Sequence, residues 1–135
     1  MNIYDKNNNI MSCIIRSDYN KSLQNIPHNF LSNKDMNFQY GISNMTKGHR
    51  IPKHYHNKIK REIIGTSEMV IVREGKLIVD IYDNEQNLLS NHTLNKNDII
   101  ILIDGGHGFE MSEDTCIFNL KQGPYEDMFN DKTHF

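Results

Sequence analysis

The sequence predicts an all-β fold made of short strands, either a sandwich or a barrel. Short apolar, β-branched runs recur along the 135 residues, and polar turn residues separate them. One segment alternates apolar residues with polar or small ones at the period of two that a half-buried strand shows. Helix signals are few: residues 57–64 allow one helical turn, but Gly65 follows at once.

The first half of the chain is expected to hold three strands. Residues 10–16 form an apolar run after an asparagine-rich turn. Residues 36–42 carry the alternating pattern, which predicts a half-buried strand. Gly48 marks a turn, and the third strand carries His54 and His56.

The second half is expected to hold four strands. Residues 69–73 and 77–81 are β-branched runs joined across Glu74-Gly75, which predicts a hairpin. Residues 99–103 are a fully apolar run between Asp- and Gly-containing turns. Residues 116–121 form the last expected strand.

Length, charge and cysteine content indicate one ordinary domain, residues 1–135, with residues 122–135 as a polar C-terminal tail. A net charge of −2 favours neither nucleic acid nor a membrane surface as partner. The N-terminus lacks the pattern of a signal peptide, and no apolar stretch approaches the roughly 18 residues that span a bilayer. Cys13 and Cys116 are far apart, which is typical of reduced cysteines. We expect a cytoplasmic protein.

Two expected strands are apolar on both faces. Residues 69–72 and 99–103 each present uninterrupted apolar side chains. One face can fill the interior of the domain, whereas the other needs a second sheet or a second subunit to cover it. The simpler prediction is a homodimer.

The main functional candidate is a group of histidines with one carboxylate. On a strand, His54 and His56 point to the same face, about 7 Å apart. Glu68 opens the next apolar run, and His107 follows another apolar run and two glycines. Imidazoles with one carboxylate suit zinc, iron, manganese or nickel. His-x-His alone is a weak motif in a chain with seven histidines, so its weight comes from these surroundings.

These residues resemble the first motif of the cupin superfamily, Gly-x5-His-x-His-x3–4-Glu-x6-Gly. Gly48, His54 and His56 have the spacing of its first half, and Glu68 and Gly75 have that of its second half. The chain departs from the family in the gap, because eleven residues separate His56 from Glu68. Glu62 is therefore an alternative carboxylate. Glu68 is preferred, which makes residues 57–67 an inserted loop near the mouth of the site.

The second cupin motif, Gly-x5-Pro-x-Gly-x2-His-x3-Asn, is matched more loosely. His107 is one residue closer to the preceding glycine than the motif expects, and it is the one histidine of that region. The corresponding positions are Asn97, Ile103, Gly105, His107 and Met111. Together the two motifs span residues 48–111. The resemblance implies a cupin-type double-stranded β-helix, that is, a jelly-roll barrel. It also implies one divalent transition metal per chain, held by His54, His56, Glu68 and His107.

The end of the chain has a narrower resemblance. Residues 118–125 and Asp131-Lys132 resemble the tail of small cupin-fold metalloproteins found among surface-polysaccharide biosynthesis genes. This resemblance implies a sugar-like small molecule or nucleotide sugar as ligand, and an isomerase, epimerase or lyase as activity. An Fe(II)-dependent dioxygenase and a non-catalytic sugar-binding or sensor module are the alternatives.

Other polar residues carry weaker predictions, and none is identified as the acid or base of a reaction. His49 can support the site or meet the ligand. Four cations can bind a phosphate or carboxylate, although a residue of this kind is more often a solvated surface charge: Arg50, Lys53, Arg61 and Lys121.

Overall fold

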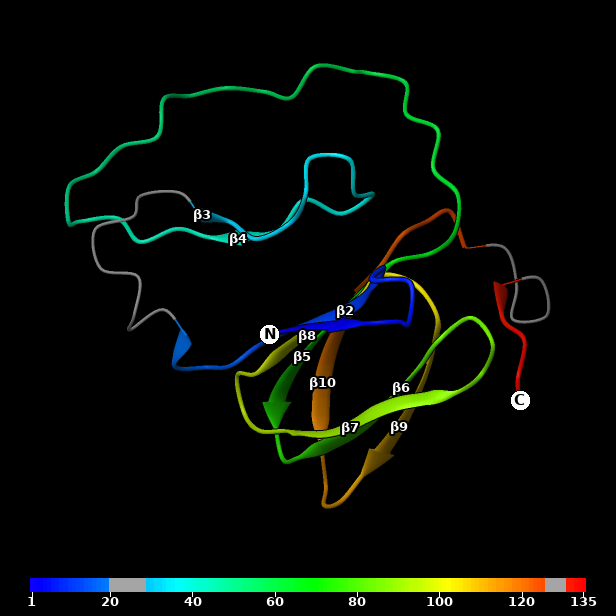
Figure 1. Ribbon diagram of the computed structural model, residues 1–135. Coiled ribbons are helices and arrows are strands. Elements are labelled where there is room, and N and C mark those ends of the chain that lie inside the picture. Colours follow the sequence, from blue (N-terminus) through cyan, green and yellow to red (C-terminus); the bar gives the residue numbers. More distant parts are fainter. Residues whose placement is uncertain (20–28, 126–130) are drawn as a thin grey trace. The chain divides into compact units, whose positions relative to one another are not determined.

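The computed structural model describes residues 1–19, 29–125 and 131–135 of the chain. Ten β-strands make up the regular elements of those residues, and none of their helical turns is long and apolar enough to cross a membrane. The all-β prediction is confirmed. The chain divides into two compact units: the first unit is Met1–Ser17 with Thr66–Phe135, and the second is Asp18–Gly65 (Figure 1).

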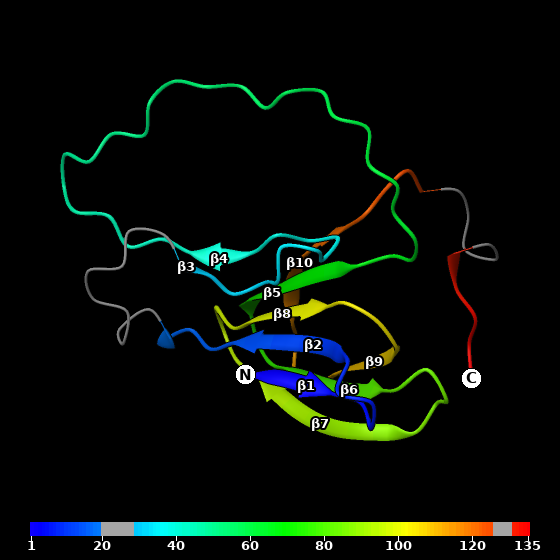
Figure 2. The ribbon, with the colours of Figure 1, turned by 45° about the horizontal axis from the view of Figure 1, so that its top comes forward.

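Eight strands of the first unit form two antiparallel sheets (Figure 2). The five-stranded sheet has the order β1-β2-β8-β5-β10. Its strands are β1 (Asn2–Tyr4), β2 (Ile10–Ile15), β8 (Ile99–Leu102), β5 (Glu68–Glu74) and β10 (Cys116–Lys121). The three-stranded sheet has the order β7-β6-β9. Its strands are β7 (Leu88–Leu94), β6 (Leu77–Tyr82) and β9 (Gly106–Met111).

The hydrophobic core lies between these two sheets. Strand β6 alternates buried and half-buried residues along its whole length, so that one face turns to the core. Both sheets contribute β-branched and leucine side chains to one apolar cluster. Its buried members are Ile3, Met11, Ile14, Val70, Val72, Leu77, Val79, Ile81, Leu94, Ile100 and Leu102. The sandwich therefore follows from the period-two burial of short apolar runs.

The sheets remain open at their edges. Within the described residues, no hydrogen-bonded ladder joins an edge strand of one sheet to an edge strand of the other. The closed barrel expected from the cupin resemblance is therefore not what these strands form. The coarser prediction, an all-β fold of antiparallel sheets, holds.

The hairpin predicted across Glu74-Gly75 is wrong in its pairing. The turn is present, but β5 pairs with β8 and β10, whereas β6 pairs with β7 and β9. The chain changes sheets here. Gly75 has a φ of 77°, and an added Cβ would collide with the Asp114 backbone and Thr115. A glycine lets two connections between the sheets cross closely at this point.

In the part of the second unit that the structure describes there is one short ladder, in which β3 (Asn29–Phe30) pairs with β4 (Gly41–Ile42). The predicted strand over residues 36–42 is therefore present only at its C-terminal end. The predicted histidine strand is wrong, because residues 49–64 have no regular structure and are exposed. Pro52 removes one backbone donor, and the polar run that follows has no apolar face to bury.

Candidate metal centre

Glu68 and His107 lie on opposite sheets at one end of the sandwich and face each other. Glu68 begins β5 and shares its strand face with Val70 and Val72, which are fully buried. His107 lies in β9 directly opposite Ile81 of β6, whose side chain is in the core. Strand register thus directs both side chains to one end of the space between the sheets.

The two side chains lie at a separation that a shared metal ion allows. His107 Nε2 is 3.6 Å from Glu68 Oε2. If both atoms were about 2.1 Å from one ion, they would subtend roughly 118° at it, within the range of metal coordination angles. The Glu68 side chain is 15% exposed and that of His107 is 32% exposed. The pair is thus sheltered but not sealed from solvent.

Neighbouring groups hold this pair in a form suited to binding a cation. Asn119 Nδ2 donates to Glu68 Oε1 at 3.4 Å, which leaves Oε2 towards His107. The His107 ring packs against Phe109, with centroids 5.1 Å apart. Burial lowers the pKa of His107; nearby Glu68 opposes this shift, and Lys132 adds to it. A neutral imidazole is the form that coordinates a metal.

Lys121 is the candidate cation placed beside this pair, since it is the register partner of Glu68 across β10 and β5. Its Nζ is 3.2 Å from Asp131 Oδ2 and 4.2 Å from the centre of the Tyr125 ring. Sequence reasoning missed Asn119. A usable signal existed, because Asn119 alternates with Ile117 and Lys121 on the inward face of β10.

His54 and His56 lie in the second unit, adjacent to each other. Their ring centroids are 5.4 Å apart in a T-shaped arrangement. His54 Nδ1 is 2.8 Å from the carbonyl oxygen of Pro52. If Nδ1 carries the proton and donates this bond, Nε2 keeps a lone pair for a metal. The alternative carboxylate, Glu62, is an exposed residue of the same unit.

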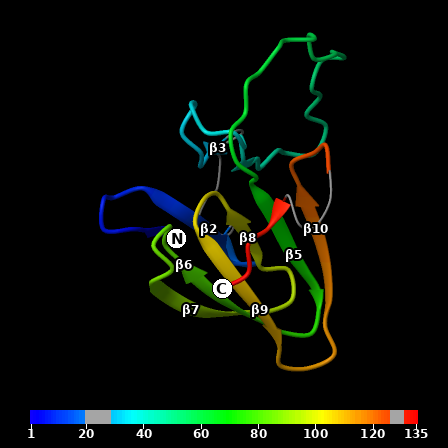
Figure 3. The same cartoon turned by 90° about the vertical axis from the view of Figure 1, so that its right-hand side faces the viewer.

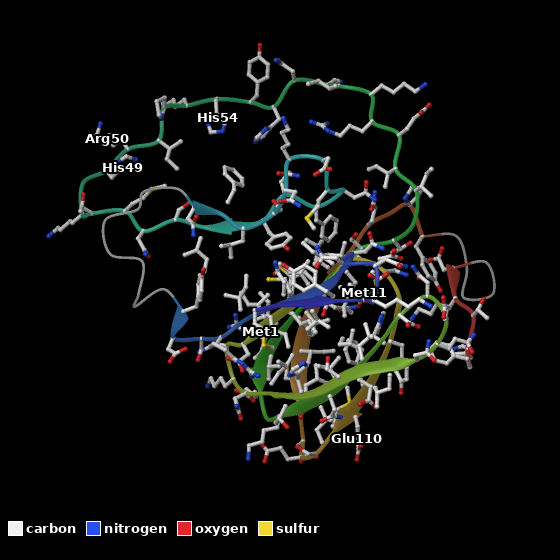
Figure 4. All side chains as sticks on the ribbon, in the orientation of Figure 1. Met1, Met11, His49, Arg50, His54 and Glu110 are labelled. Atoms are coloured by element: carbon white, nitrogen blue, oxygen red, sulfur yellow. The ribbon has the colours of Figure 1, made fainter. Side chains whose placement is uncertain are left out.

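Residues 47–61 of the second unit form a strongly cationic segment. They hold six of the chain's 15 Lys and Arg residues and none of its 17 Asp and Glu residues. All of these residues are exposed, and none of the six cations has an ion pair within the described part of its unit. Figure 4 labels His49, Arg50 and His54 along this stretch. The segment can therefore meet an anionic ligand.

The four predicted ligands thus occur as two pairs, one in each unit, and their convergence on one ion stays a prediction. Among the residues that the structure describes, no cluster of three or more His, Cys, Asp or Glu side chains is gathered for a metal. Comparison of the chain with protein-family models, curated proteins and solved structures found no match.

Proposed function

We propose that the protein is a single-domain cupin that binds one divalent transition metal through His54, His56, Glu68 and His107. The observation that carries this proposal is the Glu68–His107 pair, with Oε2 and Nε2 3.6 Å apart between the two sheets. A cupin binds its metal between sheets, in line with the inward register of both residues. The two antiparallel sheets are compatible with a jelly roll, which is the finer fold that we propose.

The ligand set favours an enzyme over a structural metal site. Three imidazoles and one carboxylate would occupy four positions of a six-coordinate ion, and structural sites are normally closed by protein ligands alone. A metal bound in this way polarises a carbonyl or hydroxyl group of a ligand that occupies the open positions. Glu68 and His107 would then hold and orient that centre. The activity that we propose is an isomerisation, epimerisation or elimination.

The proposed substrate is a sugar or nucleotide sugar of surface-polysaccharide biosynthesis. The resemblance of residues 118–125 to the tail of cupins from such pathways supports this choice. The cationic segment, residues 47–61, supports it independently, because guanidinium and ammonium groups bind phosphate oxygens. Arg50, Lys53 and Arg61 are the residues of that segment proposed to contact the phosphate.

A homodimer is the proposed assembly. On the face of the five-stranded sheet turned away from the core, β10 presents Phe118 and Leu120, each 52% exposed. Their register partners on β5 are Ile71 and Met69, which are half-buried. This apolar row is suited to burial against a second copy of the chain.

Elemental analysis of protein purified without added metal tests the metal site. The wild type is expected to hold one zinc, iron, manganese or nickel per chain. Glu68→Ala, His107→Ala and His54→Ala are each expected to lose most of it, whereas Glu62→Ala keeps it. Wild-type metal content in the His54→Ala/His56→Ala double variant would show that the ligand assignment is wrong.

Turnover assays then separate the possible functions. We expect the metal-loaded wild type, but not His54→Ala, to convert a member of a nucleotide-sugar panel without consuming oxygen. Oxygen consumption by an iron-loaded protein would instead indicate a dioxygenase. Binding of a nucleotide sugar without turnover would indicate a sensor or binding module.

A further inference from the structure

The last five residues of the chain contact the first unit at two places. Residues Asp131–Phe135 are called the strap below. They come back to the end of the sandwich where Glu68 and His107 lie, and in Figure 3 they are the red segment that ends at the C-terminus.

One anchor of the strap is on the five-stranded sheet. Asp131 Oδ2 is 3.2 Å from Nζ of Lys121, at the end of β10, and both side chains are largely shielded from solvent. Tyr125 supports the same ammonium group from the face of its ring, 4.2 Å away. Because Lys121 is the register partner of Glu68, this anchor lies beside the carboxylate of the pair.

The other anchor is on the three-stranded sheet. The Phe135 ring packs edge to face on Tyr82, with centroids 5.2 Å apart. An added Cβ at Gly106 would lie 2.7 Å from Phe135 Cζ and 3.0 Å from Cε1. The φ of Gly106 is not in the left-handed region, so its backbone conformation does not require glycine. A side chain at Gly106 would therefore push the Phe135 ring away from its contact with Tyr82.

The two anchors flank the pair. Lys121 is across the ladder from Glu68, and Gly106 directly precedes His107 in β9. A segment fixed at both points has to pass from one sheet to the other at this end of the sandwich. The anchors are one partly shielded ion pair and one aromatic contact, and neither involves a residue of the hydrophobic core, so release does not require the core to open.

We propose that the strap covers the end of the sandwich at Glu68 and His107, and that it must detach before a ligand larger than water reaches them. The contact of Phe135 with Tyr82 and Gly106 holds the end of the strap in place. This inference concerns access to the pair and holds whether or not the pair binds a metal.

The test is the rate at which diethyl pyrocarbonate modifies His107 in metal-free protein, resolved by peptide mass spectrometry. Phe135→Ala and a chain ending at residue 130 are expected to raise that rate roughly threefold or more, because detached states become the majority. Gly106→Ala is expected to do the same with the tail intact. The rate at His54 in the same samples is the internal reference.

Matched variants separate release of the strap from general loosening. Phe135→Tyr keeps the ring contact and is expected to retain the wild-type rate. Phe30→Ala removes another exposed phenylalanine, in the second unit, and is also expected to leave the His107 rate unchanged. Thermal unfolding checks that each variant is folded. An unchanged His107 rate in Phe135→Ala and in the shortened chain would overturn the proposal. Loss of the metal assignment alone would leave it standing.

Discussion

The two halves of the candidate centre are built in different ways. Glu68 alternates with the fully buried Val70 and Val72 on β5, and His107 pairs with the buried Ile81 of β6, so sheet register fixes where their side chains point. His54 and His56 sit in an exposed stretch without regular structure, where only local chain geometry relates one ring to the other. The hydrophobic core positions the first pair, whereas no regular element positions the second. This difference predicts where substitutions will matter.

The largest difference in stability is expected between a core residue of the first unit and an exposed residue of the second. Leu77 is fully buried between the sheets, whereas Ile64 in the second unit is 93% exposed. Leu77→Ala should lower the free energy of unfolding by about 2–5 kcal/mol, through lost burial and the cavity left behind. Ile64→Ala should change it by less than about 0.5 kcal/mol. Urea unfolding of both variants measures the difference; equal losses would show that the second unit has a core of its own around Ile64.

The next effect concerns the buried carboxylate of Asp98. It accepts hydrogen bonds from Arg16 Nη1 at 2.8 Å, the Ser17 amide at 2.8 Å and the Asn95 amide at 3.0 Å. It thereby connects the end of β2 to the β7–β8 turn. Asp98→Ala should lower the free energy of unfolding by about 3 kcal/mol, because these donors would be left without an acceptor.

Asp35→Ala is the matched control, since Asp35 is an exposed acid of the second unit. Its thermal midpoint should match that of the wild type. A comparable loss in both variants would mean that net charge, rather than the buried network, determines the response to removing an acid.

The sequence predicts where strands form better than it predicts which strands pair with each other. The strands predicted at residues 10–16, 69–73, 77–81, 99–103 and 116–121 are present within one residue at each end, because each is a short run rich in apolar residues. Strand β9 was missed, since its two inward residues are separated by glycine and its pattern carries little hydrophobic signal. The Glu74-Gly75 hairpin was wrong because a turn signal does not say which sheet the next strand joins.

The same distinction applies to the candidate centre. Glu68 was identified from its spacing to Gly75, and its inward direction follows from the alternation with Val70 and Val72. The strand placed at His54 and His56 failed because a period of two means little in a run without apolar residues to bury. The inward position of Asn119 follows from its alternation with Ile117 and Lys121. Its hydrogen bond to Glu68 and the contacts of the strap join residues distant in sequence, which no local pattern encodes.

A smaller effect tests the support of the first pair. Asn119→Ala removes the donor to Glu68 Oε1 and should weaken metal binding about tenfold, as loss of a group that orients a ligand commonly does. Tyr55 lies between the two histidines of the second pair in the sequence, and it is 86% exposed, so Tyr55→Ala is the matched control. It should leave the affinity unchanged. Competition with a chelating dye gives both values; a larger effect at Tyr55 would reverse the comparison between the two pairs.

The smallest effect is a pH dependence within the first unit. Burial, with a lesser contribution from Arg16, lowers the pKa of His92 on β7. Its Nε2 is shielded from solvent and has no hydrogen-bond partner among the described residues. The folded protein therefore takes up less proton at this site than the unfolded chain does. The stability involved is fully present above the ordinary histidine pKa of about 6.5 and is lost as the pH falls below it.

His92→Gln removes that titration. The difference in free energy of unfolding between the metal-free wild type and the variant should therefore shrink as the pH falls. Urea unfolding at pH 8 and pH 5.5 measures this: the wild type should lose more stability between the two values than the variant does. Equal losses would mean that the inward face of β7 is open to water at His92, and that the sheltered interior ends at Leu94.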